Sequence, residues 1–388
     1  MAKSAFSPTM PAGSLNPGFD ACGRASGPAD LYEALLARLR REHVPFSVLW
    51  ELTHVCNLRC VMCYNVPLRQ PPLTAGECFA VLEQLAAAGT LRLTLTGGEI
   101  LARPDFFAIA ERARALGFAL NLKTNGTLLT PSRADRIAAL VPIQVDISLL
   151  GATATTCDAV AGGRAVLRRV VRGVRLLQER GVRVRLNTLL LDLNVAEQRA
   201  MAELARELGV SYEQVFKVSP ADDGSYRAAG HQLSRSEMTD VLGADGTPFV
   251  PRVPAPGRRT CAAGLSSCLI SPYGVVYPCI ELRMPAGDLR RQPFAEVWAR
   301  APILQELRAR HTCEHLHDCR ECPLVRYCKG RCAGLAWKEH GDLYGGHSLA
   351  CRQAQARYAQ QHPGAPLPET PWQARRRRLG GCAECLGE

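Results

Sequence analysis

The regular alternation of strand-like and helix-like segments between residues 46 and 218 most constrains the fold. The predicted strands are 46–53, 91–96, 118–123, 142–148, 182–189 and 212–218, and the predicted helices are 74–88, 104–116, 130–140, 164–179 and 195–208. Alternation of this kind predicts an α/β fold with a parallel sheet covered by helices. Six units could form a partial barrel or an open doubly wound sheet. In either case the carboxyl ends of the strands are the expected active-site edge.

The rest of the chain divides by composition. We predict an N-terminal extension over 1–45, the α/β domain over 46–225, a Pro/Gly/Arg-rich linker over 226–260, a cysteine-rich domain over 261–355 and a Pro/Arg-rich tail over 356–388. Because the cysteine-rich segment has little apolar periodicity, we expect metal rather than a large core to hold it together. The four arginines at 375–378 are typical of a solvated tail.

Composition excludes some classes of protein. No uncharged apolar run approaches the length of a membrane span, and residues 1–20 lack the pattern of a secretory signal, so we expect a cytoplasmic protein without a membrane partner. The net charge of +11 does not by itself distinguish nucleic acid, an anionic cofactor or an acidic peptide as partner. The seventeen cysteines are an odd number in a chain without an export signal, which favours metal ligands over disulfides.

Three cysteines follow the first predicted strand directly: Cys56, Cys60 and Cys63. Thiolates suit iron–sulfur clusters, zinc and copper(I). Three ligands without a fourth nearby leave one iron of a four-iron cluster without a protein ligand, and an open metal position is typical of a catalytic site. The alternative from the residues alone is a structural zinc site.

The spacing Cys-x3-Cys-x2-Cys, with Met62 before the last cysteine, resembles the signature of the radical S-adenosylmethionine (SAM) superfamily. In that family the open iron binds SAM, and an electron from the cluster cleaves SAM to methionine and a 5′-deoxyadenosyl radical, which abstracts a substrate hydrogen. The resemblance implies a partial (β/α)6 barrel and a catalytic role for all three cysteines.

A second motif, Thr96-Gly97-Gly98-Glu99, ends the second predicted strand. Glycines permit close approach of the backbone to a ligand, and a carboxylate can accept an ammonium group. The motif matches the Gly-Gly-Glu sequence that contacts the SAM amino group in the family. Asn125 and Ser148, after the third and fourth strands, match positions that line the SAM pocket, although both also suit ordinary turns.

Nine cysteines lie between residues 261 and 351. The run Cys-x2-Cys-x5-Cys-x3-Cys that ends at Cys332, preceded by Gly274-x4-Cys279, resembles the SPASM domain, which binds two auxiliary four-iron clusters. The resemblance assigns the outer cluster to Cys319, Cys322, Cys328 and Cys351. It assigns the inner cluster to Cys261, Cys279 and Cys332, with Cys268 as the fourth ligand.

Zinc is the alternative for this segment, because Cys-x2-Cys pairs and the nearby His311, His315 and His317 are also typical zinc ligands. The remaining cysteines stand outside these patterns. We expect Cys22, Cys78 and Cys157 to be free thiols. Cys382 and Cys385 could be a metal-binding or redox pair, although we expect an unstructured pair of thiols.

The leading functional hypothesis is a radical SAM maturase with SAM and three 4Fe-4S clusters, which installs a crosslink or an oxidation in a peptide or protein. Family members that mature sulfatases carry Asp after the cysteine equivalent to Cys279, whereas this chain has Ile280 and then Glu281. The loop 218–225 is expected to face the substrate, with Asp222 and Asp223 able to meet a cationic group, or to be an ordinary acidic turn.

Several partners and alternatives complete this hypothesis. Expected partners are a reductant such as flavodoxin or ferredoxin and a separate leader-peptide-binding protein; no nucleic acid is expected. One alternative is a radical SAM oxidant of a small molecule, either a haem side chain or an aminocyclitol. Another is a non-catalytic iron–sulfur or zinc electron-transfer protein.

Overall fold

The computed structural model describes residues 28–66, 68, 70–225, 228–242, 249–255 and 257–378. Cys22 and the Cys382/Cys385 pair, about which predictions were made, lie outside this part of the chain. Among the described helices, none is long and apolar enough to cross a membrane.

Six parallel strands form the centre of the fold. They are β1 (Ser47–Thr53), β2 (Arg92–Gly97), β3 (Ala119–Thr124), β4 (Gln144–Ser148), β5 (Val184–Leu189) and β6 (Ser211–Val215), and they neighbour one another in chain order. A doubly wound sheet would reverse direction at a switch point, and this sheet does not. Right-handed crossovers that all proceed in the same direction along the sheet place every helix on one face of it. The predicted partial barrel is therefore confirmed.

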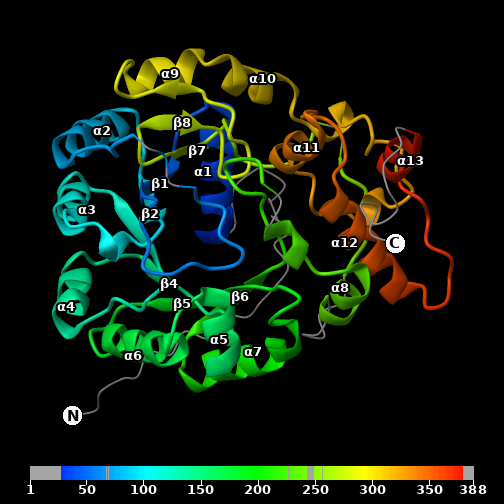
Figure 1. The fold of residues 1–388 in the computed structure, drawn as a ribbon. Coiled ribbons are helices and arrows are strands. Elements are labelled where there is room, and N and C mark those ends of the chain that lie inside the picture. Colours follow the sequence, from blue (N-terminus) through cyan, green and yellow to red (C-terminus); the bar gives the residue numbers. More distant parts are fainter. Residues whose placement is uncertain are drawn as a thin grey trace, which may run out of the picture.

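Helices cover the outer face of this barrel (Figure 1). They are α2 (Ala75–Ala87), α3 (Phe106–Ala115), α4 (Pro131–Ala139), α5 (Ala154–Ala161), α6 (Val166–Gln178) and α7 (Gln198–Glu207), with the short helices η1 (Ile100–Ala102) and η2 (Val195–Glu197). Thr74 caps α2 through a reciprocal capping box with Glu77, as its position at the start of the predicted helix suggested.

The strands alternate between the two faces of the sheet, as a period of two requires. Leu93, Leu95 and Leu120 are fully buried on the helix side. The opposite, concave face carries charge: Asp146 on β4 bonds Lys123 on β3 at 2.9 Å and Arg185 on β5 at 2.9 Å. The barrel interior is therefore a polar surface suited to a ligand.

The cysteine-rich segment continues the same sheet. β7 (Ser267–Ile270) pairs in parallel with β1, and β8 (Val275–Tyr277) and β9 (Gly287–Asp288) follow antiparallel, so the sheet has nine described strands. Helices α9 (Phe294–Arg300) and α10 (Pro302–Arg310) bury Phe294 and Leu304 completely in the barrel's own hydrophobic core. The expectation that this segment lacks a substantial core is therefore wrong for its first half.

The remaining elements surround the later cysteines. They are η3 (Ala228–His231), α8 (Arg235–Val241), η4 (Cys313–His315), η5 (Val325–Tyr327), α11 (Ala333–His340), α12 (Ser348–Gln361) and α13 (Pro371–Arg378). α8, within the expected linker, packs on α12. In α13, Arg375 lies 3.3 Å from Asp342 and 3.6 Å from Asp318. The arginine run is thus helical up to residue 378, and Arg375 is packed rather than part of a solvated tail.

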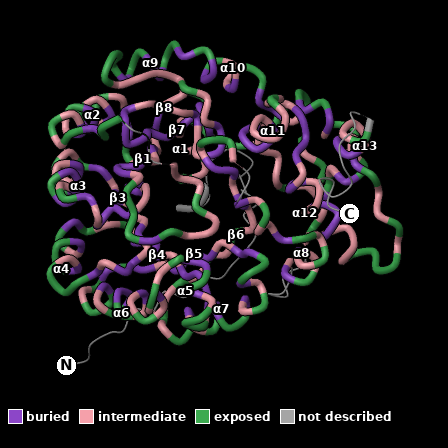
Figure 2. The backbone as a smooth tube through the Cα atoms, in the orientation of Figure 1, coloured by how far each residue is buried: buried purple, intermediate pink, exposed green. Residues whose placement is uncertain are grey.

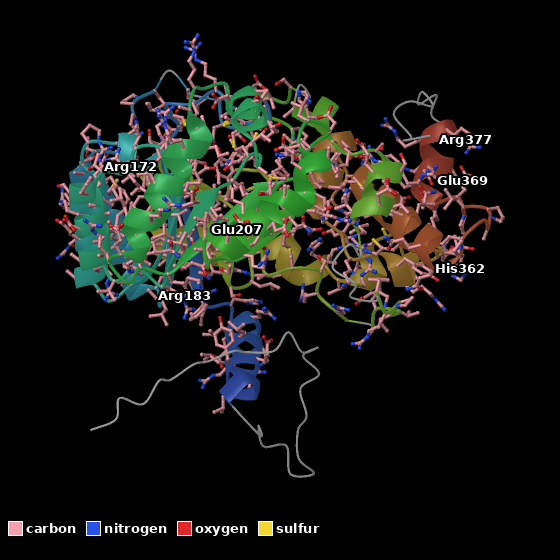
Figure 3. The ribbon with its side chains drawn as sticks, turned by 90° about the horizontal axis from the view of Figure 1, so that it is seen from below. Arg172, Arg183, Glu207, His362, Glu369 and Arg377 are labelled. Atoms are coloured by element: carbon pink, nitrogen blue, oxygen red, sulfur yellow. The ribbon has the colours of Figure 1, made fainter. Side chains whose placement is uncertain are left out.

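The exposed and buried residues follow this architecture. The buried residues concentrate in the sheet and on the sides of the helices that face it (Figure 2). The helix α1 (Pro28–Arg41), blue in Figure 3, projects away from the body of the molecule.

Because Phe294 belongs to the shared core, Phe294→Ala should destabilise the barrel as well as α9. We expect a loss of about 3–5 kcal/mol in the free energy of unfolding, measured by urea denaturation of the reconstituted protein with circular dichroism. The control Leu31→Ala, at a side chain that is 64% exposed on α1, should change it little. If Phe294→Ala left the unfolding transition of the barrel unchanged, the core under α9 would be separate from the core of the barrel.

Candidate active site

The three N-terminal thiols lie together in the loop that leaves the carboxyl end of β1. Burial, followed by the neighbouring Cys63 and Cys56, raises the pKa of Cys60 to about 12. Cys56 and Cys63 are exposed. Because desolvated, mutually repelling thiolates need a positive partner, this arrangement fits a cluster bound from one open side.

Backbone hydrogen bonds hold this loop on two sides. Gly98 and Glu99 donate their amides to the carbonyls of Thr53 (2.6 Å) and Val55 (2.9 Å). On the other side, Arg59 and Val61 donate to carbonyls near the carboxyl end of α5, both at 3.0 Å. These backbone bonds hold the loop, so the thiols are available to bind metal.

The two glycines are required by the cysteine loop itself. A Cβ on Gly97 would lie 2.2 Å from the carbonyl oxygen of Thr53, and one on Gly98 would lie 2.4 Å from that of Val55. Gly97 also has a φ of 136°, a conformation that favours glycine. The close approach expected toward a ligand is therefore, in this structure, an approach of β2 to the chain's own loop.

Glu99 joins the ends of β2 and β3. Its fully buried carboxylate accepts hydrogen bonds from the Leu101 amide (3.0 Å), the Thr124 hydroxyl (2.6 Å) and the Asn125 amide (2.7 Å). Burial raises its pKa despite these bonds. The contacts give Glu99 a positioning role at the carboxyl ends of β2 and β3, and its contact with the SAM ammonium stays a prediction.

Two further predicted residues lie at the same edge. The Asn125 amide nitrogen is 3.8 Å from the Cys56 sulfur and donates to the Asn57 side chain at 2.9 Å. Ser148 ends β4 and is in register with Asn187 on β5. The structure thus brings Asn125 to the triplet and places Ser148 further along the rim.

A buried ion pair that sequence reasoning missed connects the barrel to the cysteine-rich segment. Glu51 on β1 is fully buried and accepts two hydrogen bonds from the Arg283 guanidinium, at 2.7 and 3.0 Å. Tyr64, next to Cys63, donates its hydroxyl to the same carboxylate at 3.1 Å, and Asp222 lies 3.1 Å from Arg283 Nε. A single carboxylate in the apolar strand 47–53 was the available signal.

The electrostatics of Glu51 follow from these partners. Burial alone would raise its pKa, but hydrogen bonds from His54 and Arg283, together with the Arg283 charge, outweigh burial and lower the pKa to about 2. These contacts give Glu51 a structural role between β1 and the cysteine-rich segment.

The predicted outer thiols meet in one place. Cys319, Cys322, Cys328 and Cys351 line a single cavity, together with Arg331 and others. Burial raises the pKa of Cys351 well above its usual range, with smaller contributions from the other three thiols. Four partly buried thiols around one cavity fit a fully ligated four-iron cluster.

Two of the three histidines that could bind zinc are engaged by other residues. His315 and His317 have partners outside the thiols, namely Thr312 (2.7 Å) and Asp342 (2.8 Å).

The inner thiols form a third group, without Cys268. Cys279 has its pKa raised to about 12, first by burial and then by Cys332 and, more weakly, Cys261. Cys268 lies in β7, is 3% exposed and interacts with Arg308 of α10. The arrangement does not support its predicted role as fourth ligand. Cys78 and Cys157 are buried, and their expected role as free thiols stays a prediction.

Comparison with known proteins agrees with this geometry. Residues 50–205 match the family model of the radical SAM superfamily, and residues 261–323 match that of the SPASM iron–sulfur cluster-binding domain. The AdoMet-dependent heme synthase of Methanosarcina barkeri is 31% identical over 335 residues, covering 77% of this chain and 94% of that protein. The chain belongs to the radical SAM superfamily.

Other relatives extend this finding. The mycofactocin maturase MftC of Mycobacterium ulcerans is 30% identical over 315 residues, 74% of this chain and 85% of MftC. Among solved structures, Streptococcus suis SuiB bound to its precursor peptide SuiA has a TM-score of 0.62 at 17% identity and covers 87% of this chain and 84% of SuiB. Native anSMEcpe with bound AdoMet has a TM-score of 0.61 at 16% identity, covering 82% of this chain and 97% of anSMEcpe.

These radical SAM relatives establish the class of the protein. It is a radical SAM enzyme with a SPASM domain, and it binds iron–sulfur clusters and SAM. The solved structures, at under a fifth identity, support the fold alone. The finding favours an enzyme over a non-catalytic electron-transfer protein.

Gly98→Ala tests the backbone contact that holds the cysteine loop. The added methyl displaces the Val55 carbonyl, so we expect loss of the SAM-dependent change in the electron paramagnetic resonance spectrum of the reduced protein, at least tenfold by signal area. Gly76→Ala in α2, where a Cβ would meet nothing within 4 Å, is the matched control and should leave that change intact. An unaltered response in Gly98→Ala would contradict the proposed constraint.

Arg283→Met tests the buried ion pair. It removes the guanidinium from the buried Glu51 carboxylate and from Asp222, and we expect a loss of about 3–5 kcal/mol in the free energy of unfolding at pH 7. The double variant Glu51→Gln/Arg283→Met should recover part of that loss, because residue 51 then carries no charge. Arg291→Met, at a side chain 84% exposed, is the control. Equal stability of Arg283→Met and Arg291→Met would contradict a structural role for the pair.

Proposed function

We propose that this enzyme is a maturase that abstracts hydrogen from a peptide or protein and installs a crosslink or an oxidation. The observation that carries the proposal is that β1, the loop of the first three cysteines and the segment after Cys279 meet at one rim of the barrel. Arg283, four residues beyond Cys279, shares the Glu51 carboxylate with Tyr64, the neighbour of Cys63. A substrate there would lie between the radical source and the inner thiols, as an oxidation requires.

The proposal assigns three clusters to three groups of thiols. Cys56, Cys60 and Cys63 would hold the SAM-binding cluster, with Gly97, Gly98, Glu99, Asn125 and Ser148 around SAM. Cys319, Cys322, Cys328 and Cys351 would hold the outer cluster, and Cys261, Cys279 and Cys332 the inner one. When bound, the SAM cluster and SAM supply the 5′-deoxyadenosyl radical.

The net reaction must remove two hydrogens from the substrate for each crosslink. One would leave as a hydrogen atom, for which bound SAM would supply the acceptor radical. The other would leave as a proton and an electron, for which an auxiliary cluster held by the cysteine-rich segment would supply the electron acceptor. Asp222 would accept the proton: its amide donates to the Tyr64 carbonyl at 2.9 Å, beside Cys63, and its carboxylate lies 3.1 Å from Arg283 Nε. The loop 218–225 is thus a part of the active site in this proposal.

A peptide substrate is supported by the similarity to MftC over most of both chains. The polar concave face, with Asp146, Lys123 and Arg185, suits the mixed side chains of a peptide. A separate leader-binding protein and a flavodoxin or ferredoxin would complete the system.

A second candidate is oxidation of a small carboxylated molecule such as a haem precursor. The observation that favours it is the 31% identity to AdoMet-dependent heme synthase over 94% of that protein. Both candidates use the same radical chemistry and differ only in the substrate.

Deuterium transfer distinguishes these candidates. The reconstituted enzyme, with SAM and dithionite, is incubated with deuterated peptides encoded beside its gene and, separately, with deuterated tetrapyrroles. We expect one deuterium in 5′-deoxyadenosine, and a peptide that has lost two hydrogens, by mass spectrometry. Deuterium transfer from a tetrapyrrole and from no peptide would contradict the maturase.

Asp222→Asn tests the proton acceptor in the same assay. Peptide product should fall by about 10²-fold while 5′-deoxyadenosine still forms, because hydrogen abstraction precedes loss of the proton. Asp240→Asn, on the exposed side of α8, is the control and should leave product formation unchanged. Equal product from Asp222→Asn and the control would remove Asp222 from the mechanism.

A further inference from the structure

One cavity beside the outer thiols is lined by positive charge. It has a volume of about 560 Å³ and lies between the segments 249–260 and 313–331. Among the described residues that line it there is no carboxylate, whereas six side chains are cationic. The net charge of +11, to which composition alone assigns no partner, is therefore partly concentrated at this one place. The six cations are Arg252, Arg258, Arg259, Arg326, Lys329 and Arg331.

These charges are not neutralised within the described part of the chain, where none of the six forms an ion pair. Backbone carbonyls hold two of them instead. Arg331 donates to the carbonyls of Val325 and Cys328, both at 3.0 Å. Arg259 donates to the Leu307 carbonyl at 3.0 Å. A carbonyl oxygen orients a guanidinium without cancelling its charge, so the cations repel one another and a bound anion would stabilise their arrangement.

Backbone hydrogen bonds connect the two walls of the cavity. The Arg252 amide donates to the Arg326 carbonyl at 3.0 Å, and the Cys313 amide donates to the Arg258 carbonyl at 3.0 Å. Arg252, Arg258 and Arg326 are nevertheless exposed, so a ligand can reach them from solvent. The cavity is therefore formed and accessible before a ligand binds.

The shape and charge of this cavity indicate which class of anion fits it. Nucleic acid is bound along an extended basic stripe and a protein partner across a broad interface, whereas this volume is typical of a small-molecule site. Five of the six cations are arginines, whose planar guanidinium groups match pairs of phosphate oxygens. One carboxylate would leave most of the six charges unneutralised. A small ligand with several phosphate charges fits best.

We propose that this cavity binds a small polyanion of the oligophosphate class through the cations that line it. Cys328 lines both this cavity and the one shared by the outer thiols, so the bound anion would lie beside that group. The inference does not rest on the proposed maturase function, because it concerns only the residues of this cavity.

Inorganic triphosphate is the probe, titrated into the anaerobically reconstituted protein in a chloride buffer without divalent cations. Isothermal titration calorimetry should give a Kd below about 1 mM. A triglutamate peptide with blocked ends should bind at least about tenfold more weakly, because its carboxylates lie on a flexible chain that binding must order.

Variants locate the binding. Arg252→Gln and Arg326→Gln each remove one charge from one wall and should weaken triphosphate binding about tenfold. Arg326→Lys keeps the charge and should recover part of that loss. Arg199→Gln, at an exposed residue of α7 outside the cavity, makes the same change in net charge and should bind triphosphate as the wild type does. Circular dichroism and the iron content confirm that each variant is folded.

Three results would overturn the proposal. The first is no binding of triphosphate at about 1 mM. The second is an equal Kd for Arg252→Gln, Arg326→Gln and Arg199→Gln, which would show an adventitious ion only, attracted by the overall charge. The third is binding of triglutamate as tight as that of triphosphate, which would assign the cavity to an acidic polypeptide. The readout needs neither SAM nor substrate, so it is independent of whether the maturase activity is found.

Discussion

The ion pair between Glu51 and Arg283 is the contact on which the arrangement of the active site depends. A carboxylate buried in a strand is costly unless it is paired and hydrogen-bonded, and Arg283 supplies two bonds while Tyr64 supplies a third. One partner lies beside the first cysteine group and the other beside Cys279. The pair therefore fixes the barrel and the β7–β8 hairpin relative to each other. Because either charge would be costly to bury without the other, the pair favours the arrangement in which the two parts form one site.

The cysteine loop illustrates a division of labour between backbone and side chains. Backbone bonds from β2 and to the end of α5 hold the loop, and Glu99 ties β2 to β3 without using a thiol. The two glycines permit this because any side chain would collide with the loop carbonyls. The thiols are consequently positioned by hydrogen bonds between neutral backbone groups. The repulsion between three neighbouring thiolates is offset only when a metal binds them.

Much of this architecture is predictable from local patterns. The six strands appear within two residues of their predicted starts, because hydrophobic periodicity and helix caps such as Thr74 are local signals. The spacing of Cys319, Cys322 and Cys328 likewise predicts their common cavity, since closely spaced ligands converge locally.

The features that the sequence did not reveal are contacts between residues far apart in the chain. Ser47 pairs with Ser267, and Glu51 with Arg283, across more than two hundred residues, and no local pattern encodes such contacts. The pairing of β7 with β1 also decides the face on which Cys268 lies. Spacing alone favours Cys268 as a ligand, whereas its burial in β7 depends on the register with β1 and β8, which spacing does not encode.

The central claim is that three separate groups of thiols each hold a four-iron cluster. Iron, sulfide and zinc per chain, measured after anaerobic reconstitution of the wild type and of the variant with Cys56, Cys60 and Cys63 changed to Ala, test it most directly. The account predicts about 12 irons with matching sulfide, falling to about 8 in the variant. About one or two zinc ions with little iron would contradict it, because the cysteine-rich segment would then be a structural zinc domain.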